Sequence, residues 1–226
     1  MRVAVTSPFF HLLPYLQEEL LSKYPDSKFK DTFDPLNKAD FIEFCKGYDA
    51  ALIGLDRIDD EVLTALPELK IIALCSAGAD HLDPVALKKR GVKMGWVAGI
   101  NKDAVAEMTI STMINILRNF HNLSERLHKG EWPKRRGGGS LLKGKIVGLH
   151  GCGNVGKEVV KRLQPFEVEI IAHDREDYSE FYSEFNVRAV STEELWKESD
   201  IISIHVSRNS STIGLYDEAV LDKLKH

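Results

Sequence analysis

The sequence predicts an α/β protein with two parallel-sheet domains, and three observations carry that prediction. Short apolar runs alternate with amphipathic stretches through the first hundred residues, and a second series of the same kind begins near residue 145. Runs without polar alternation are typical of parallel strands that are covered on both faces. Between the two series lies a long amphipathic stretch, which Pro133 and the glycines at 137–139 bring to an end.

The first series predicts strands separated by helices, as expected for one α/β sheet. The predicted strands are residues 3–6, 50–53, 70–74 and 92–94. The predicted helices are residues 14–24, 59–65 and 83–90.

The central stretch predicts a single helix that begins at a cap on Asp103 and ends near Lys129. A helix of this length can link two domains or form a dimer contact. Six of its residues fall near one face: Ala104, Met108, Ser111, Thr112, Asn115 and Ile116.

The second series predicts another run of strands and helices. Its strands are residues 145–150, 169–173, 187–189 and 200–205, and its helices are residues 154–163, 192–198 and 217–224.

Composition argues against several classes of protein. The chain has 226 residues, of which 43% are hydrophobic and 28% charged, with a formal net charge of −4. This balance is typical of a globular domain, and it lacks the concentrated basic face that nucleic acid requires. The basic cluster at residues 134–136 favours a solvated loop, with a phosphate contact as the alternative. No run is long enough to predict a membrane span, and no His or Cys spacing predicts a metal site.

Three widely spaced cysteines predict free thiols and a cytoplasmic protein, because a disulfide framework needs pairs. These cysteines are Cys45, Cys75 and Cys152.

The motif Gly151-Cys152-Gly153-Asn154-Val155-Gly156 matches G-x-G-x-x-G between a predicted strand and a predicted helix. In a dinucleotide site Gly151 permits the tight turn, and Gly153 lets the backbone approach the pyrophosphate. Gly156 lets the helix pack closely on the strand. The helix N-terminus then offers free N–H groups and a positive dipole end to the phosphates.

Asp174 lies at the end of the next predicted strand, 18 residues beyond Gly156. Its carboxylate can accept hydrogen bonds from the adenosine ribose and would repel a 2′-phosphate, which favours NAD over NADP. Arg175 acts slightly against that preference. The alternatives are a structural turn with a surface aspartate, or a nucleotide-sugar or S-adenosyl ligand in the same turn.

Four stretches resemble the D-isomer-specific 2-hydroxyacid dehydrogenases, in the family's order. They are SAGADHLD at 76–83, NKDAVAE at 101–107, LKGKIVG at 142–148, and SIHV at 203–206 with STIGL at 211–215. The resemblance implies two Rossmann-like or flavodoxin-like domains. Residues 1–97 would be the substrate-binding (catalytic) domain and residues 98–226 an NAD-binding Rossmann domain that is incomplete at its C-terminus. It also implies a homodimer through the 101–129 helix and the loop after it.

The resemblance further implies an NAD-dependent oxidoreductase that transfers hydride between NAD(H) and a 2-hydroxy or 2-oxo acid. Candidate substrates are 3-phosphoglycerate, glycerate/hydroxypyruvate and glyoxylate. Backbone amides of Ala77 and Gly78 would hold the substrate carboxylate. The other implied contacts are with the coenzyme: Asn154 and Val155 at the pyrophosphate, Asp174 at the ribose, and His205, Val206, Ser207 and Thr212 on the far half.

No residue of the chain is predicted to be catalytic. In the family an Arg, and a His paired with a Glu, perform catalysis, and their positions would fall beyond His226. We therefore expect a C-terminally truncated chain, with a non-catalytic NAD(H)-binding dimeric module as the alternative. His226 is no substitute, because a chain end does not hold a base in a fixed geometry. His150 and His173 are interpreted as structural.

Overall fold

The computed structural model describes residues 1–132 and 139–225. The chain divides into two compact units, Met1–Ala98 and Gly99–His226, one residue beyond the boundary expected from the sequence. The loop predicted around the basic cluster at 134–136 lies outside the described residues, as does His226.

Unit 1 contains a parallel sheet whose strand order is β2-β1-β3-β4-β5. This 2-1-3-4-5 order is that of flavodoxin-like folds, so the predicted α/β class is confirmed for this unit. The strands are β1 (Val3–Val5), β2 (Lys28–Phe29), β3 (Ala50–Ile53), β4 (Ile71–Leu74) and β5 (Lys93–Gly95).

Helices cover both faces of this sheet, because alternate residues of a buried strand point to opposite faces. Val3 and Val5 pack in the cluster that contains Phe10, whereas Ala4 packs in the cluster that contains Phe41. The helices are α1 (Pro8–Leu12), α2 (Pro14–Lys23), α3 (Lys38–Cys45), α4 (Asp60–Ala65) and α5 (Pro84–Arg90). Sequence patterns missed α1, β2 and α3.

Unit 2 contains a second parallel sheet, of order β8-β7-β6-β9. Numbered within the unit this is 3-2-1-4, the order of the Rossmann fold. The strands are β6 (Ile146–His150), β7 (Glu169–His173), β8 (Val187–Ala189) and β9 (Ile201–Ile204). The helices after β6 are α8 (Asn154–Leu163), α9 (Ser179–Glu184), α10 (Thr192–Glu198) and α11 (Glu218–Leu221), with a 3-10 turn at Gln164–Phe166.

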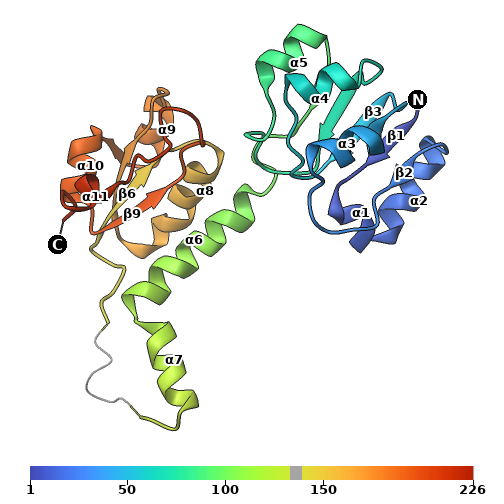
Figure 1. Cartoon of the computed structure of the whole chain (residues 1–226). Helices are drawn as coiled ribbons and strands as arrows, with labels where there is room; N and C mark the ends of the chain where they lie inside the picture. The colour runs from blue at the N-terminus through green and yellow to red at the C-terminus, as the bar shows by residue number, and fades with distance from the viewer. Residues whose placement is uncertain (133–138, 226) are drawn as a thin grey trace. The chain divides into compact units, whose positions relative to one another are not determined.

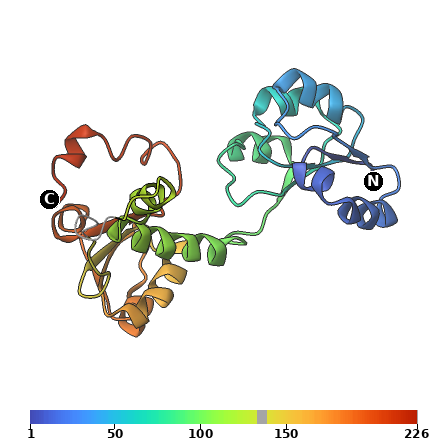
Figure 2. The same cartoon turned by 90° about the horizontal axis from the view of Figure 1, so that it is seen from below.

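The two faces of this sheet are covered by different helices (Figures 1 and 2). One face packs against α8 and α6 (Lys102–Leu117), through Val147 and Leu149 of β6. The opposite face lies under α10 and α11, where Leu195, Trp196 and Val220 form a smaller cluster. Gly148 points to this second face, because an added Cβ there would collide with Ser199. His150, two residues along the same strand, shares that face.

The single helix predicted from Asp103 to Lys129 is wrong in two respects. Two helices occupy the stretch, α6 and α7 (Phe120–His128), and they are separated at Asn119, which adopts a left-handed conformation with φ of 51°. Asp103 is not the cap: it lies in the first turn of α6, after Asn101, and pairs with Arg162 at 2.6 Å.

The six residues that were predicted to share one face of the central helix lie on its solvent-exposed side. The buried residues of α6 are Ala106, Ile110 and Met113. All six residues assigned to the predicted face are exposed: Ala104, Met108, Ser111, Thr112, Asn115 and Ile116. Among the described helices, none has both the length and the hydrophobicity to cross a membrane.

Candidate functional site

The turn after β6 depends on Gly151, whose φ of 97° is one that other residues rarely adopt. An added Cβ there would also lie 2.7 Å from the backbone nitrogen of Val206. At Gly156, in the first turn of α8, an added Cβ would lie 2.5 Å from the carbonyl oxygen of Gly151. Glycine at both positions therefore lets the helix, the turn and the segment after β9 come together.

Gly153 differs, because an added Cβ at this position would meet no described atom within 4 Å. The residue precedes Asn154 at the start of α8 and offers no side-chain cap. The first backbone N–H groups of a helix have no intrahelical acceptors, so they are available to an anion. Open space at Gly153 beside free N–H groups fits the pyrophosphate of a dinucleotide.

Asp174, directly after β7, is bonded to the glycine turn. Its Oδ2 accepts a hydrogen bond from the backbone N–H of Cys152 at 2.6 Å, and its Oδ1 accepts one from the N–H of Glu176 at 3.0 Å. A carboxylate has about four acceptor positions, so two of them remain for ribose hydroxyls. The side chain thus holds the turn in place and can still bind a ligand.

A cavity of about 350 Å³ lies at the carboxyl ends of β6, β7 and β9. Ligands of open parallel sheets bind at this edge, where the strand order changes direction. Six predicted coenzyme residues line the cavity: Gly153, Asp174, His205, Val206, Ser207 and Thr212. Of the other predicted residues, Gly151, Asn154, Val155 and Gly156 belong to the adjoining turn and helix start.

The segment after β9 is held in place by hydrogen bonds. The N–H of His205 donates to the carbonyl oxygen of His150 at 2.7 Å, which joins the segment to β6. Thr212 Oγ1 donates to the carbonyl oxygen of Ser207 at 2.7 Å and accepts from the N–H of Asn209 at 2.9 Å. The wall of the cavity formed by this segment is thus held by the Thr212 side chain as well as by the sheet.

His205 is mostly withdrawn from solvent, and burial lowers the pKa of its imidazole. Its Nε2 lies 2.9 Å from Ser203 Oγ. A neutral ring beside the cavity suits both alternatives for this residue, a coenzyme contact and a structural hydrogen bond.

Two histidines interpreted as structural, His150 and His173, also line the cavity. His150 Nδ1 lies 2.8 Å from the hydroxyl oxygen of Tyr216, and burial, followed by the neighbouring His173, lowers the pKa of His150. Sequence position could have assigned both histidines to the site, because each one directly precedes a residue that was predicted to bind the coenzyme. Leu215, the last residue of the STIGL stretch, also lines the cavity. Tyr178 and Thr192 line it as well, and no sequence motif marked these two residues.

The charges at the rim favour a ribose over a phosphorylated ribose. Two carboxylates, Asp174 and Glu176, line the cavity together with Arg175. Arg175 is exposed and pairs with Glu176 at 3.3 Å, so its charge is partly compensated. A 2′-phosphate would face two negative groups and one partly paired cation, which disfavours NADP.

The predicted substrate loop follows β4 in unit 1. The backbone N–H groups of Ala77 and Gly78 donate to no described residue, so both can bind a carboxylate. The loop is fixed from two sides, because Ser76 Oγ donates to the carbonyl oxygen of Gly78 at 2.8 Å and Trp96 Nε1 donates to that of Ala77 at 3.2 Å.

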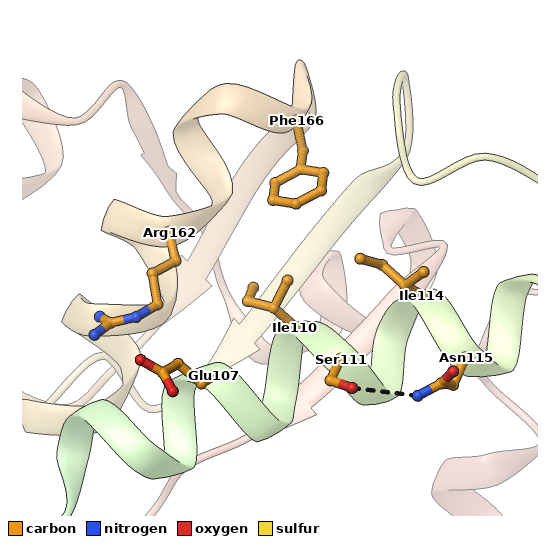
Figure 3. Close-up of a pocket in the computed structure, with 7 residues that line it drawn as sticks. All are labelled: Glu107, Ile110, Ser111, Ile114, Asn115, Arg162 and Phe166. Atoms are coloured by element: carbon orange, nitrogen blue, oxygen red, sulfur yellow. Dashed lines mark hydrogen bonds between the residues drawn. The ribbon is translucent and has the colours of Figure 1, made fainter.

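A larger hollow, of about 550 Å³, lies between α6 and the end of α8 (Figure 3). It shares no lining residue with the cavity at the strand ends. Ile110, Ile114 and Phe166 supply its apolar part. Its cation, Arg162, is already paired with Glu158 at 2.7 Å and with Asp103. We assign no ligand to it.

Comparisons with known proteins agree with this geometry. The model of the D-isomer specific 2-hydroxyacid dehydrogenase NAD binding domain matches residues 110–226. The glyoxylate reductase of Thermofilum pendens is 34% identical over 197 residues, which cover 84% of this chain and 58% of that protein. The glyoxylate reductase/hydroxypyruvate reductase of Mus musculus is 30% identical over 235 residues, covering 100% of this chain and 70% of that protein.

A solved structure agrees at the level of the fold. The glyoxylate reductase from Paecilomyes thermophila has a TM-score of 0.85 and 28% identity, covering 100% of this chain and 70% of that one. The chain thus spans only part of the length of the relatives that it matches. The family model, however, matches more than half of the chain, in the part that holds the glycine turn and the cavity. The chain therefore belongs to the D-isomer-specific 2-hydroxyacid dehydrogenases, and residues 110–226 match the NAD-binding domain of that family.

Proposed function

We propose that unit 2 binds NAD(H) and that the protein transfers hydride between this coenzyme and a 2-hydroxy or 2-oxo acid. The observation that carries the proposal is the bond between Asp174 and the glycine turn, beside open space at Gly153. This arrangement offers one place to a ribose and one to a pyrophosphate. The coenzyme supplies the hydride chemistry, and the protein binds and orients it.

The substrate is proposed as a small acid whose carboxylate meets the free amides of Ala77 and Gly78. The candidates are 3-phosphoglycerate, glycerate/hydroxypyruvate and glyoxylate. Relatives of this chain are named glyoxylate reductase, hydroxypyruvate reductase and D-3-phosphoglycerate dehydrogenase, which supports the class without choosing among the three.

Calorimetric titration of the 226-residue chain with NADH and NADPH tests the coenzyme proposal. We expect NADH to bind about tenfold or more tightly than NADPH, and Asp174→Asn to reduce that ratio because a charge that repels the 2′-phosphate is lost. Glu180→Gln, which removes an exposed carboxylate from α9, is the matched control and should leave the ratio unchanged. Absence of NADH binding at millimolar concentration would refute the proposal. Displacement of NADH by S-adenosyl or nucleotide-sugar compounds at lower concentration would assign the turn to those ligands.

Turnover separates the enzyme from the alternative of a non-catalytic NAD(H)-binding module. The assay follows NADH absorbance with glyoxylate, hydroxypyruvate and 3-phosphohydroxypyruvate. Reduction of one of them supports the enzyme, whereas tight NADH binding without any turnover supports the non-catalytic module or an inactive fragment of such an enzyme.

We also propose that the protein is a homodimer and resides in the cytoplasm. The dimer contact would use the exposed apolar side chains of α6 and α7, among them Met108, Ile116 and Phe120. The three cysteines are free thiols, which suits a reducing compartment. Cell fractionation tests the location.

A further inference from the structure

The floor of the cavity at the strand ends contains two imidazoles. His150 ends β6 and His173 ends β7, and the two residues are paired in register across the parallel strands. Their rings lie edge to face, with centroids 5.4 Å apart and an interplanar angle of 76°. Side chains paired in this way lie on the same face of the sheet, here the face under α10.

One hydrogen bond fixes the tautomer of His173. Its Nδ1 lies 3.0 Å from the carbonyl oxygen of Val190. Because a carbonyl oxygen can only accept, Nδ1 carries the hydrogen in that bond. In the neutral ring Nε2 then presents a lone pair and acts as an acceptor. No described residue donates to Nε2, and the half-buried ring lines the cavity.

This acceptor lies beside the residue that would hold the adenosine ribose. Asp174 follows His173 directly, and both line the same cavity. A base attached to a ribose at Asp174 is one glycosidic bond away from that sugar, so it falls within the reach of the neighbouring side chains. Tyr178 and Leu215 supply flat and apolar surface on the walls, as the faces of a purine require.

We propose that Nε2 of His173 accepts a hydrogen bond from the 6-amino group of adenine, and so selects adenine over a 6-oxo purine. The inference rests on the proposed NAD(H) site and adds the recognition of the base. A 6-oxo purine would present an oxygen, itself an acceptor, to the lone pair of Nε2. Two acceptors facing each other leave both groups unpaired, and an unpaired buried polar group costs affinity.

The experiment compares two coenzymes by calorimetric titration of the 226-residue chain. One is NADH, and the other is the reduced nicotinamide hypoxanthine dinucleotide, which has an oxygen in place of the 6-amino group. We expect the wild-type protein to bind NADH about tenfold or more tightly.

Two variants test the residue. His173→Leu should bind NADH about tenfold more weakly and the hypoxanthine analogue almost unchanged, so that the ratio falls towards one. His173→Gln should retain most of the preference, because one amide can donate to Val190 and still accept from the base. His121→Leu, an exposed histidine on α7, is the control and should match the wild type. If His173→Leu does not fold, the comparison of His173→Gln with the wild type remains.

The outcomes separate this inference from the coenzyme proposal. Equal affinity of the wild type for the two dinucleotides overturns the role of His173 and leaves the NAD(H) site intact. An equal loss of both affinities in His173→Leu also overturns it, because the residue would then only support packing. Failure of the wild type to bind either dinucleotide overturns the NAD(H) site itself.

Discussion

At the scale of single residues, the three glycines after β6 are needed for three different physical reasons. Gly151 has a positive φ, and Gly156 lies against the carbonyl oxygen of Gly151. Glycine is therefore required at positions 151 and 156 by the fold itself, whether or not a ligand is bound. Gly153 has open space around it, so its requirement comes from the ligand. Substitution by alanine should therefore separate folding from binding within one motif.

Gly156→Ala should destabilise the protein by about 1–3 kcal/mol, because the added methyl group must displace backbone. Gly153→Ala should lower the free energy of unfolding by less than about 1 kcal/mol, the scale of a change at a helix cap. The same Gly153→Ala protein should lose most of its NADH affinity, since its methyl group would occupy the space of the pyrophosphate. Urea denaturation measures the stability of both variants, and NADH titration measures the affinity of Gly153→Ala for the coenzyme.

The contrast between the two variants is the critical result. A Gly153→Ala protein that binds NADH as well as the wild type would show that the pyrophosphate does not lie at this turn. Comparable loss of stability in both variants would show that Gly153 is as closely packed as Gly156.

At the scale of elements, Glu158 connects α6 and α8. It accepts from Lys102 of α6 at 3.0 Å, and from Lys161 and Arg162 of α8 at 3.0 and 2.7 Å. The hydrogen bonds from these cations, that from Lys102 first, lower the pKa of Glu158 to about 2. Burial opposes the shift, so the cations outweigh the cost of removing the carboxylate from water.

A group whose pKa is lower in the folded state stabilises the protein above its unfolded pKa, and the gain is lost as the pH falls. For Glu158 the relevant interval runs from the ordinary value of 4.5 down to about 2. Glu158→Gln should lower the free energy of unfolding by about 1–2 kcal/mol at pH 7, because the partners are partly exposed to solvent. The difference from the wild type should shrink between pH 4.5 and pH 2.

Urea denaturation at pH 7, 4 and 3 measures this effect. Glu125→Gln is the control, because it removes an exposed pair with Lys129 on one helix and should cost little at any of these pH values. A difference between wild type and Glu158→Gln that does not depend on pH would contradict the assignment.

At the scale of the whole molecule, the exposed apolar residues of α6 and α7 would form the interface of the proposed homodimer. Met108, Ile116, Phe120 and Leu127 have exposed fractions of 68, 74, 59 and 47%. Contiguous exposed apolar surface is typical of a protein interface.

Ile116→Asp should shift the protein from dimer to monomer in sedimentation velocity, because a buried unpaired carboxylate would destabilise the contact. Val85→Asp, at an equally exposed position in unit 1 with 74% exposure, should leave the sedimentation coefficient unchanged. A monomeric wild type, or a dimer that tolerates Ile116→Asp, would refute this interface.

Sequence patterns located most of the strands because buried parallel strands are nearly continuous apolar runs, as in residues 50–53 and 169–173. They missed β2, which has only two residues, and α1, which has five. Such short elements are held by their neighbours rather than by their own periodicity. The break at Asn119 was also missed, because a single residue in the left-handed conformation leaves no mark in hydrophobic spacing, although asparagine adopts that conformation more readily than most residues.

The sequence by itself determined the α/β class, the glycine turn and Asp174, because a phosphate-binding turn needs particular residue types at fixed spacing. It also determined the family, through motifs in a fixed order. Only the tertiary structure decided that His150, His173 and Thr192 share one cavity with Asp174, and that Asp174 also holds the turn through Cys152. Such residues come together at the ends of three different strands, and strand order is a property of the folded sheet. A local sequence pattern predicts the secondary structure of one segment, whereas a binding site depends on which segments lie side by side in the folded protein.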